Sequence, residues 1–137
     1  MFLNLLQPDQ QVTFVHAARA VVEQDGEVSE VESALLDAVR AECGLDELPV
    51  PDPALDVCAR AAEVLPDDVA RRVFLLELAG VALIDGDAHP SEIGLVREVA
   101  DALGISGAAL DDMLAFAARA QQLVVDGQRI VATGASA

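Results

Sequence analysis

The sequence predicts an all-α fold, a single-domain bundle of about six helices with an internal pseudo-twofold repeat. Apolar residues recur at helical spacing along much of the chain, and no segment alternates in the manner of a strand. A pattern also returns at an offset of 60 residues, which pairs Phe14 with Phe74 and Asp25 with Asp85 without a gap. The length of 137 residues suits one compact core, so residues 1–137 are expected to form one domain.

The first helix pair is expected at about 9–24 and 30–43. Phe14 begins an apolar stripe on the first of these helices, and similar spacing follows on the second. Gly26 and Gly44 stand where the two periodic stretches stop, as glycine commonly does at helix ends. The two glycines therefore predict where each helix of this pair ends.

A stiff connector separates the two halves, because residues 48–53 read Leu-Pro-Val-Pro-Asp-Pro. A third helix is expected at about 53–64. The second pair is expected at about 67–84 and 90–103, which gives internal repeats at about 9–48 and 67–106. A last helix is expected at about 107–124, and the small residues of 130–137 are expected to form a flexible tail.

The charge balance narrows the range of partners. The chain carries a formal charge of -16, its eight cationic residues are all arginine, and 53% of its residues are apolar. A folded acidic protein of this kind would repel phosphates, so nucleic acid is not an expected partner. Cations or a basic protein surface fit better.

The compartment is expected to be the cytoplasm. The longest apolar run, residues 73–84, contains Glu77 and is too short for a membrane span of roughly 20 residues. No signal-peptide pattern is present at Met1. Cys43 and Cys58 lack metal or disulfide spacing, so they are interpreted as buried reduced thiols.

Two acidic turns carry the functional information in the sequence. Asp25-Gly26-Glu27 is followed by Glu32, and Asp85-Gly86-Asp87 is followed by Glu92. One interpretation is helix capping, because Ser29 with Glu32 forms a capping-box pattern and His89, Pro90 and Glu92 occupy the corresponding start of another helix. The other interpretation is a shared site for a hard cation, because an aspartate at a helix C-terminus opposes the macrodipole and carboxylate oxygens suit such ions.

A self-sufficient EF-hand is excluded in both copies. With Gly26 at the invariant glycine position of a calcium loop, Val21 falls where the first ligand belongs. In the second copy Val81 and Leu83 occupy the first and third ligand positions. Aliphatic side chains cannot ligate a cation, so any site must be shared between segments.

The doubled motif resembles the TerB-like family of tellurite-resistance proteins and related domains, and the resemblance covers most of the chain. It implies two helix pairs packed with pseudo-twofold symmetry and acidic turns gathered on one surface. It also implies a divalent-cation-binding accessory domain in a bacterial stress-response assembly, with protein partners and no enzymatic activity. By matching positions, the implied metal ligands are Asp25, Glu32, Asp85 and Glu92, with Glu27, Asp87 and His89 as possible neighbours.

Calcium or magnesium is the favoured ion, and His89 leaves a transition metal as an alternative. An enzyme is not expected, because the Glu-x-x-His pairs of a di-iron bundle, a phosphate loop and a nucleophile elbow are all absent. The alternative function is a metal-independent protein-protein interaction module whose acidic turns are only helix caps. A monomer or small homo-oligomer is expected. Glu77 is expected to pair with an arginine such as Arg19 or to face the acidic surface.

Overall fold

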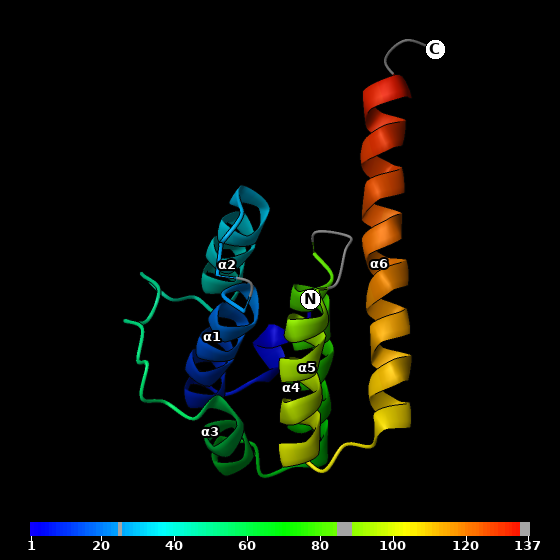
Figure 1. Cartoon of the computed structure of the whole chain (residues 1–137). Coiled ribbons are helices and arrows are strands. Elements are labelled where there is room, and N and C mark those ends of the chain that lie inside the picture. The colour runs from blue at the N-terminus through cyan, green and yellow to red at the C-terminus, as the bar shows by residue number, and fades with distance from the viewer. Residues whose placement is uncertain (25, 85–88, 135–137) are drawn as a thin grey trace.

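A computed structural model describes residues 1–24, 26–84 and 89–134, and these residues form six α-helices and one short 3₁₀ helix without a strand (Figure 1). The all-α, single-domain fold class is therefore confirmed. The elements are η1 (Leu3–Leu5), α1 (Pro8–Val22), α2 (Glu30–Glu42), α3 (Val57–Val64), α4 (Asp68–Ala82), α5 (Pro90–Ala102) and α6 (Gly107–Gly134).

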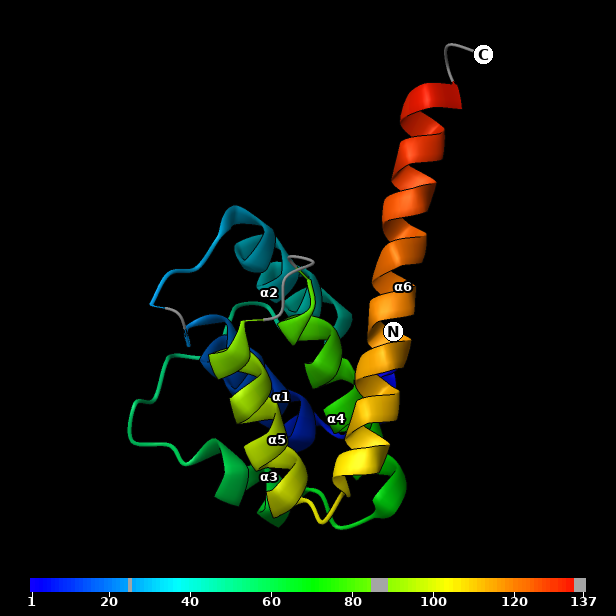
Figure 2. The same ribbon diagram turned by 45° about the vertical axis from the view of Figure 1, so that its right-hand side comes forward.

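Helix α4 holds the bundle together, since it packs against α1, α5, α6 and η1. Helix α3 packs beneath α1 and α5, while α2 packs on α1 and η1 (Figures 1 and 2). The centre of the core is an edge-to-face pair of fully buried rings, Phe14 of α1 and Phe74 of α4, whose centroids are 5.3 Å apart. Burial of this size is the main source of stability in such a domain.

Local sequence explains where the helices begin. The Ser29 hydroxyl accepts from the Glu32 backbone N–H at 3.1 Å, and Glu32 Oε1 accepts from the Ser29 N–H at 3.0 Å, so the predicted capping box is confirmed. Asp56 and Asp67 cap α3 and α4 by accepting from backbone N–H groups three residues ahead. Pro90 occupies the first turn of α5, as predicted.

The helix bounds repeat with the same offset as the sequence pattern. Helices α1 and α4 each contain 15 residues, and α2 and α5 each contain 13. Both pairs of bounds differ by 60, and Gly44 and Gly104 follow α2 and α5 with φ of 70° and 72°. A positive φ of this size favours glycine at the helix end. The pseudo-twofold packing of the two helix pairs stays a prediction.

The predicted end of the last helix at about 124 is wrong, because α6 continues to Gly134. Residues 130–134 of the predicted flexible tail are thus helical, and residues 135–137 lie outside the described part. The glycines and β-branched residues of this segment lower helix propensity without forbidding the conformation. Helix α3 begins at Val57 rather than near 53, because Asp56 supplies the N-cap. The 3₁₀ helix η1 was not predicted.

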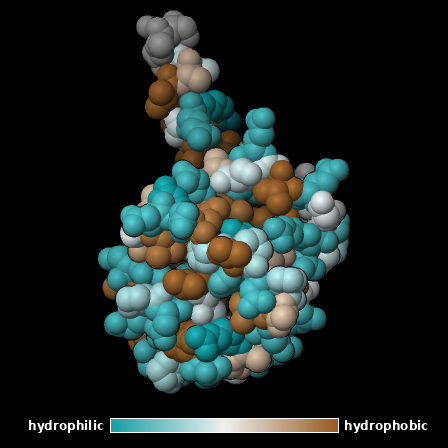
Figure 3. All heavy atoms as spheres, turned by 90° about the vertical axis from the view of Figure 1, so that its left-hand side faces the viewer, coloured by the Kyte–Doolittle hydropathy of each residue, from teal (hydrophilic) through white to brown (hydrophobic). Residues whose placement is uncertain are grey.

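Helix α6 runs beside α4 and then extends past it (Figure 2). The Gln121 side-chain amide donates to the Ile84 carbonyl at 3.2 Å, just beyond the C-terminal end of α4. The following residues, 122–134, project from the body and are called the tip (Figure 3). Within the described residues, no helix combines the length and the apolar character needed to cross a membrane.

Candidate functional site

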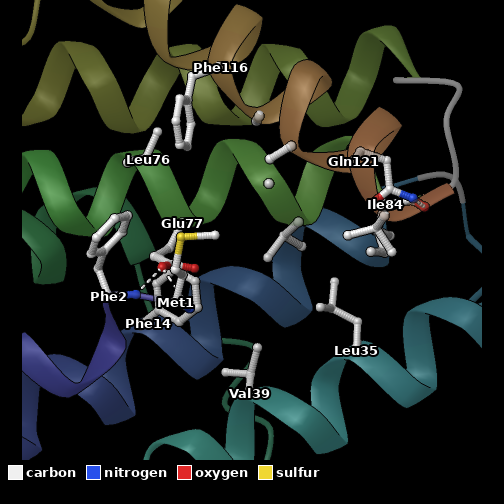
Figure 4. Close-up of a pocket in the computed structure, with 15 residues that line it drawn as sticks. Met1, Phe2, Phe14, Leu35, Val39, Leu76, Glu77, Ile84, Phe116 and Gln121 are labelled. Atoms are coloured by element: carbon white, nitrogen blue, oxygen red, sulfur yellow. Dashed lines mark hydrogen bonds and ion pairs between the residues drawn. The ribbon is translucent and has the colours of Figure 1, made fainter. Parts of the chain in front are cut away.

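An apolar groove of about 240 Å³ opens between α2, α4 and α6 (Figure 4). Helix α4 forms the floor, α2 forms one wall with Leu35 and Val39, and α6 forms another with Phe116 and Val124. Met1 and Phe2 line it beside Glu77. The full lining consists of Met1, Phe2, Phe14, Leu35, Val39, Leu76, Glu77, Gly80, Val81, Ile84, Phe116, Ala117, Ala120, Gln121 and Val124.

Gly80 leaves free space in the groove. It lies in the interior of α4, where glycine destabilises a helix by about 1 kcal/mol relative to alanine. A Cβ built at this position meets no atom within 4 Å among the described residues. Packing within the described part of the chain therefore does not require glycine here, and the groove floor is open at this point.

Glu77 is the charged side chain in the groove lining, and its predicted pairing with an arginine such as Arg19 is wrong. Its carboxylate lies 3.0 Å from the amino group of Met1 and accepts a hydrogen bond from the backbone N–H of Phe2 (Figure 4). The Arg19 guanidinium instead donates to the Pro49 carbonyl at 2.8 Å. The Glu77 carboxylate is therefore paired with the Phe2 backbone N–H and the Met1 amino group. The spacing of side chains in the sequence could not predict these two partners.

The two glutamates of the sequence-predicted metal site are buried. Glu32 is 2% exposed and Glu92 is 5% exposed, and both occupy the third position of their helices. Glu32 has the capping role described above, so one of its oxygens already accepts a backbone hydrogen bond. A carboxylate has further acceptor capacity, and metal-ligating carboxylates are themselves commonly hydrogen-bonded. The capping geometry is therefore compatible with either interpretation of Glu32.

The remaining predicted ligands are less well placed or lie outside the described residues. Asp25, Asp85 and Asp87 fall among the residues that the structure does not describe. Glu27 is exposed on the turn before α2. His89 Nδ1 accepts from the Ser91 backbone N–H at 3.2 Å as the cap of α5, which leaves Nε2 as its other ring nitrogen. Within the described ranges, no group of three or more His, Cys, Asp or Glu side chains is arranged to hold a metal ion.

The groove was not found by sequence reasoning. Its residues come from the N-terminal segment, α1, α2, α4, α6 and the residues just after α4, and most of them are ordinary apolar residues of amphipathic helices. No local pattern marks the groove, because its walls come from segments far apart in the sequence. No protein-family model, curated protein or solved structure matches this chain, so membership of the TerB-like family stays a prediction.

Proposed function

We propose that this chain is a non-enzymatic interaction module whose groove between α2, α4 and α6 binds an apolar helical segment of a protein. The observation that carries this proposal is the open apolar groove, whose floor is left free at Gly80. Helix-in-groove binding uses this combination of apolar walls and an accessible floor. The acidic body would select against nucleic acid and against other acidic surfaces.

A neutral solvatochromic dye, Nile red, tests whether the groove accepts an apolar ligand. At a protein concentration low enough for the chain to be a monomer, we expect its fluorescence to rise on binding. The Gly80→Leu variant should weaken binding by at least about 10-fold, because the added side chain occupies the groove floor. Gly80→Leu should not unfold the chain, because leucine favours a helix more than glycine does. The matched control is Gly94→Leu, at an exposed glycine of α5 that also has free space around its Cβ. Equal dye binding by both variants and the wild type would contradict the proposal.

Divalent-cation binding is the second candidate function. It is supported by two buried carboxylates, Glu32 and Glu92, that occupy the same position at the starts of α2 and α5. Carboxylate oxygens suit hard cations, and Asp25 and Asp85 would be further ligands. The TerB-like resemblance adds an expected setting, a cytoplasmic stress-response assembly in which the groove receives a protein component.

Thermal unfolding followed by circular dichroism tests the cation site. After exhaustive chelation, calcium, magnesium, manganese and zinc are added separately at fixed ionic strength. At about 100 times the dissociation constant, a specific ion should raise Tm by roughly 10 °C. The Asp25→Asn and Asp85→Asn double variant should lose this rise, while the control pair Asp46→Asn and Asp101→Asn should retain it. The absence of any ion-specific shift would leave the acidic turns with a capping role alone.

A further inference from the structure

The tip presents a large apolar surface to solvent. Five of its side chains are aliphatic and between 43% and 78% exposed, namely Leu123, Val124, Val125, Ile130 and Val131. The figures show this segment standing clear of the body, with apolar side chains along it (Figures 1 and 3). Contiguous apolar surface of this kind marks an interaction site more often than a solvated one.

The tip also lacks the composition of a self-supporting helix. Four of the five exposed aliphatic residues are β-branched, and Gly127 lies between them. Such residues have low helix propensity, and most helical stability in proteins comes from tertiary packing, which the body gives to the first part of α6 rather than to the projecting tip. We therefore expect the tip to be stabilised as a helix by contact with another apolar surface that covers its apolar side.

Charge favours a second copy as that surface. Residues 120–134 contain one acidic residue, Asp126, and one basic residue, Arg129, so this segment is neutral in a chain of -16. Two copies would repel each other over most of their surfaces, and the neutral tip is where they can approach. The groove offers an apolar lining, which suits the aliphatic residues of the tip, and Arg129 of the tip is already paired with Asp126 at 3.0 Å.

The contact area favours one arrangement of the two copies. The tip is about 20 Å long and about 10 Å wide, so it presents a strip of only about 200 Å². A contact between two tips alone buries this one strip on each copy, whereas insertion of each tip into the other copy's groove buries both a tip and a groove on each copy. The groove lies beside Phe116 and Ala120, so both tips can reach it together only if the two α6 helices run antiparallel.

We propose, on the basis of the groove function above, that two copies form a twofold dimer in which each tip lies antiparallel to α6 of the other copy and fills its groove. Small residues set the register, because Ala120 of one copy and Gly127 of the other allow close approach of the helices. The twofold axis then passes beside Leu123 and Val124. Four of the exposed aliphatic residues share one side of the tip, and they become buried with the open floor at Gly80 in one interface; they are Leu123, Val124, Ile130 and Val131.

Sedimentation equilibrium over a range of protein concentrations tests the dimer. The wild type should show the mass of two chains, while the tip variant Ile130→Glu/Val131→Glu and the groove variant Gly80→Leu should each raise the dimer dissociation constant at least about 100-fold. Matched controls are Val69→Glu, at a 58% exposed valine of α4 away from the groove, and Gly94→Leu. Circular dichroism of each variant verifies that the bundle remains folded.

Oxidative cross-linking tests the register. In a Cys43→Ala/Cys58→Ala background, Leu123→Cys should form a disulfide-linked dimer, because this position meets its own copy at the twofold axis. Val131→Cys should remain a monomer under the same conditions, because its counterpart lies far away along an antiparallel pair. Efficient linking of Val131→Cys without linking of Leu123→Cys would overturn the antiparallel arrangement.

The outcomes separate this dimer from the proposed groove function. A wild type that is monomeric at about 100 μM, or a dimer that survives the tip substitutions, would overturn the second-copy proposal. Nile red binding by the tip variant, with loss in Gly80→Leu, would still support the groove as a docking site for another helix. If the tip variant fails to bind the dye, the proposed function itself is contradicted, whatever the oligomeric state of the wild type.

Discussion

Cys43 shows how a single side chain responds to its place in the bundle. It caps the C-terminal end of α2, where burial raises the pKa of its thiol from the usual 9.0 to about 11 and the carboxylates of Glu42 and Glu77 add to the rise. Burial likewise raises the pKa of the Cys58 thiol. Both cysteines are free, as the sequence predicted, but both are only half-buried. Their low reactivity therefore comes from a disfavoured thiolate rather than from complete shielding.

Alkylation rates test this consequence. Iodoacetamide reacts with the thiolate, so at pH 8 we expect Cys43 of the folded chain to react about 100 times more slowly than Cys43 of the urea-unfolded chain. Peptide mass spectrometry gives the rate at each site. Because the folded state holds the proton more tightly, the contribution of Cys43 to stability is present below pH 9 and is lost as the pH rises through 11. Equal rates in the two states would contradict the raised pKa.

At the scale of elements, Arg71 joins the ends of three helices. Its guanidinium donates to the carbonyls of Leu65 and Ala62 near the end of α3, at 2.6 and 3.4 Å. It also donates to the Leu103 carbonyl at the end of α5, at 2.9 Å. The last carbonyls of a helix have no hydrogen-bond donor within their own helix. The Arg71 side chain on α4 supplies donors to these carbonyls of α3 and α5, which would otherwise need water molecules as partners.

Substitution of Arg71 tests this role. We expect Arg71→Lys to lower the free energy of unfolding by about 1–3 kcal/mol, because a lysine ammonium cannot reproduce the planar fork that reaches both α3 and α5. Arg72→Lys is the matched control, since Arg72 is the adjacent arginine and is exposed. Urea titrations followed by circular dichroism give both values. The same small loss for the two variants would show that the three helix ends do not depend on the fork.

The helices themselves were largely predictable from local sequence. Apolar spacing located α1, α2, α4 and α5, and capping patterns such as Ser29 with Glu32 placed their starts. The extension of α6 was not predictable in the same way, because the tip combines helical spacing with residues that disfavour a helix. Which tendency prevails depends on packing, and packing cannot be read from one segment.

At the scale of the whole molecule, charge was predictable and the candidate site only in part. The net charge of -16 follows from composition and limits the possible partners. The acidic turns were visible as a repeated motif, but Asp25 and Asp85 lie outside the described residues, so the shared cation site stays a prediction. The groove required the fold, because it exists only when α2, α4 and α6 are placed together.

The ring pair at the centre of the core bears on how equivalent the two halves of the chain are. Phe14 and Phe74 occupy matching positions of the 60-residue pattern, yet their rings meet at 87° in an edge-to-face contact. In such a pair one ring supplies its positively polarised edge and the other its negatively polarised face. An exact twofold axis between the two rings would give both the same surroundings, so the edge-to-face contact excludes such an axis. The two halves of the chain are therefore electrostatically different at this contact, and the same substitution at Phe14 and at Phe74 should have different effects.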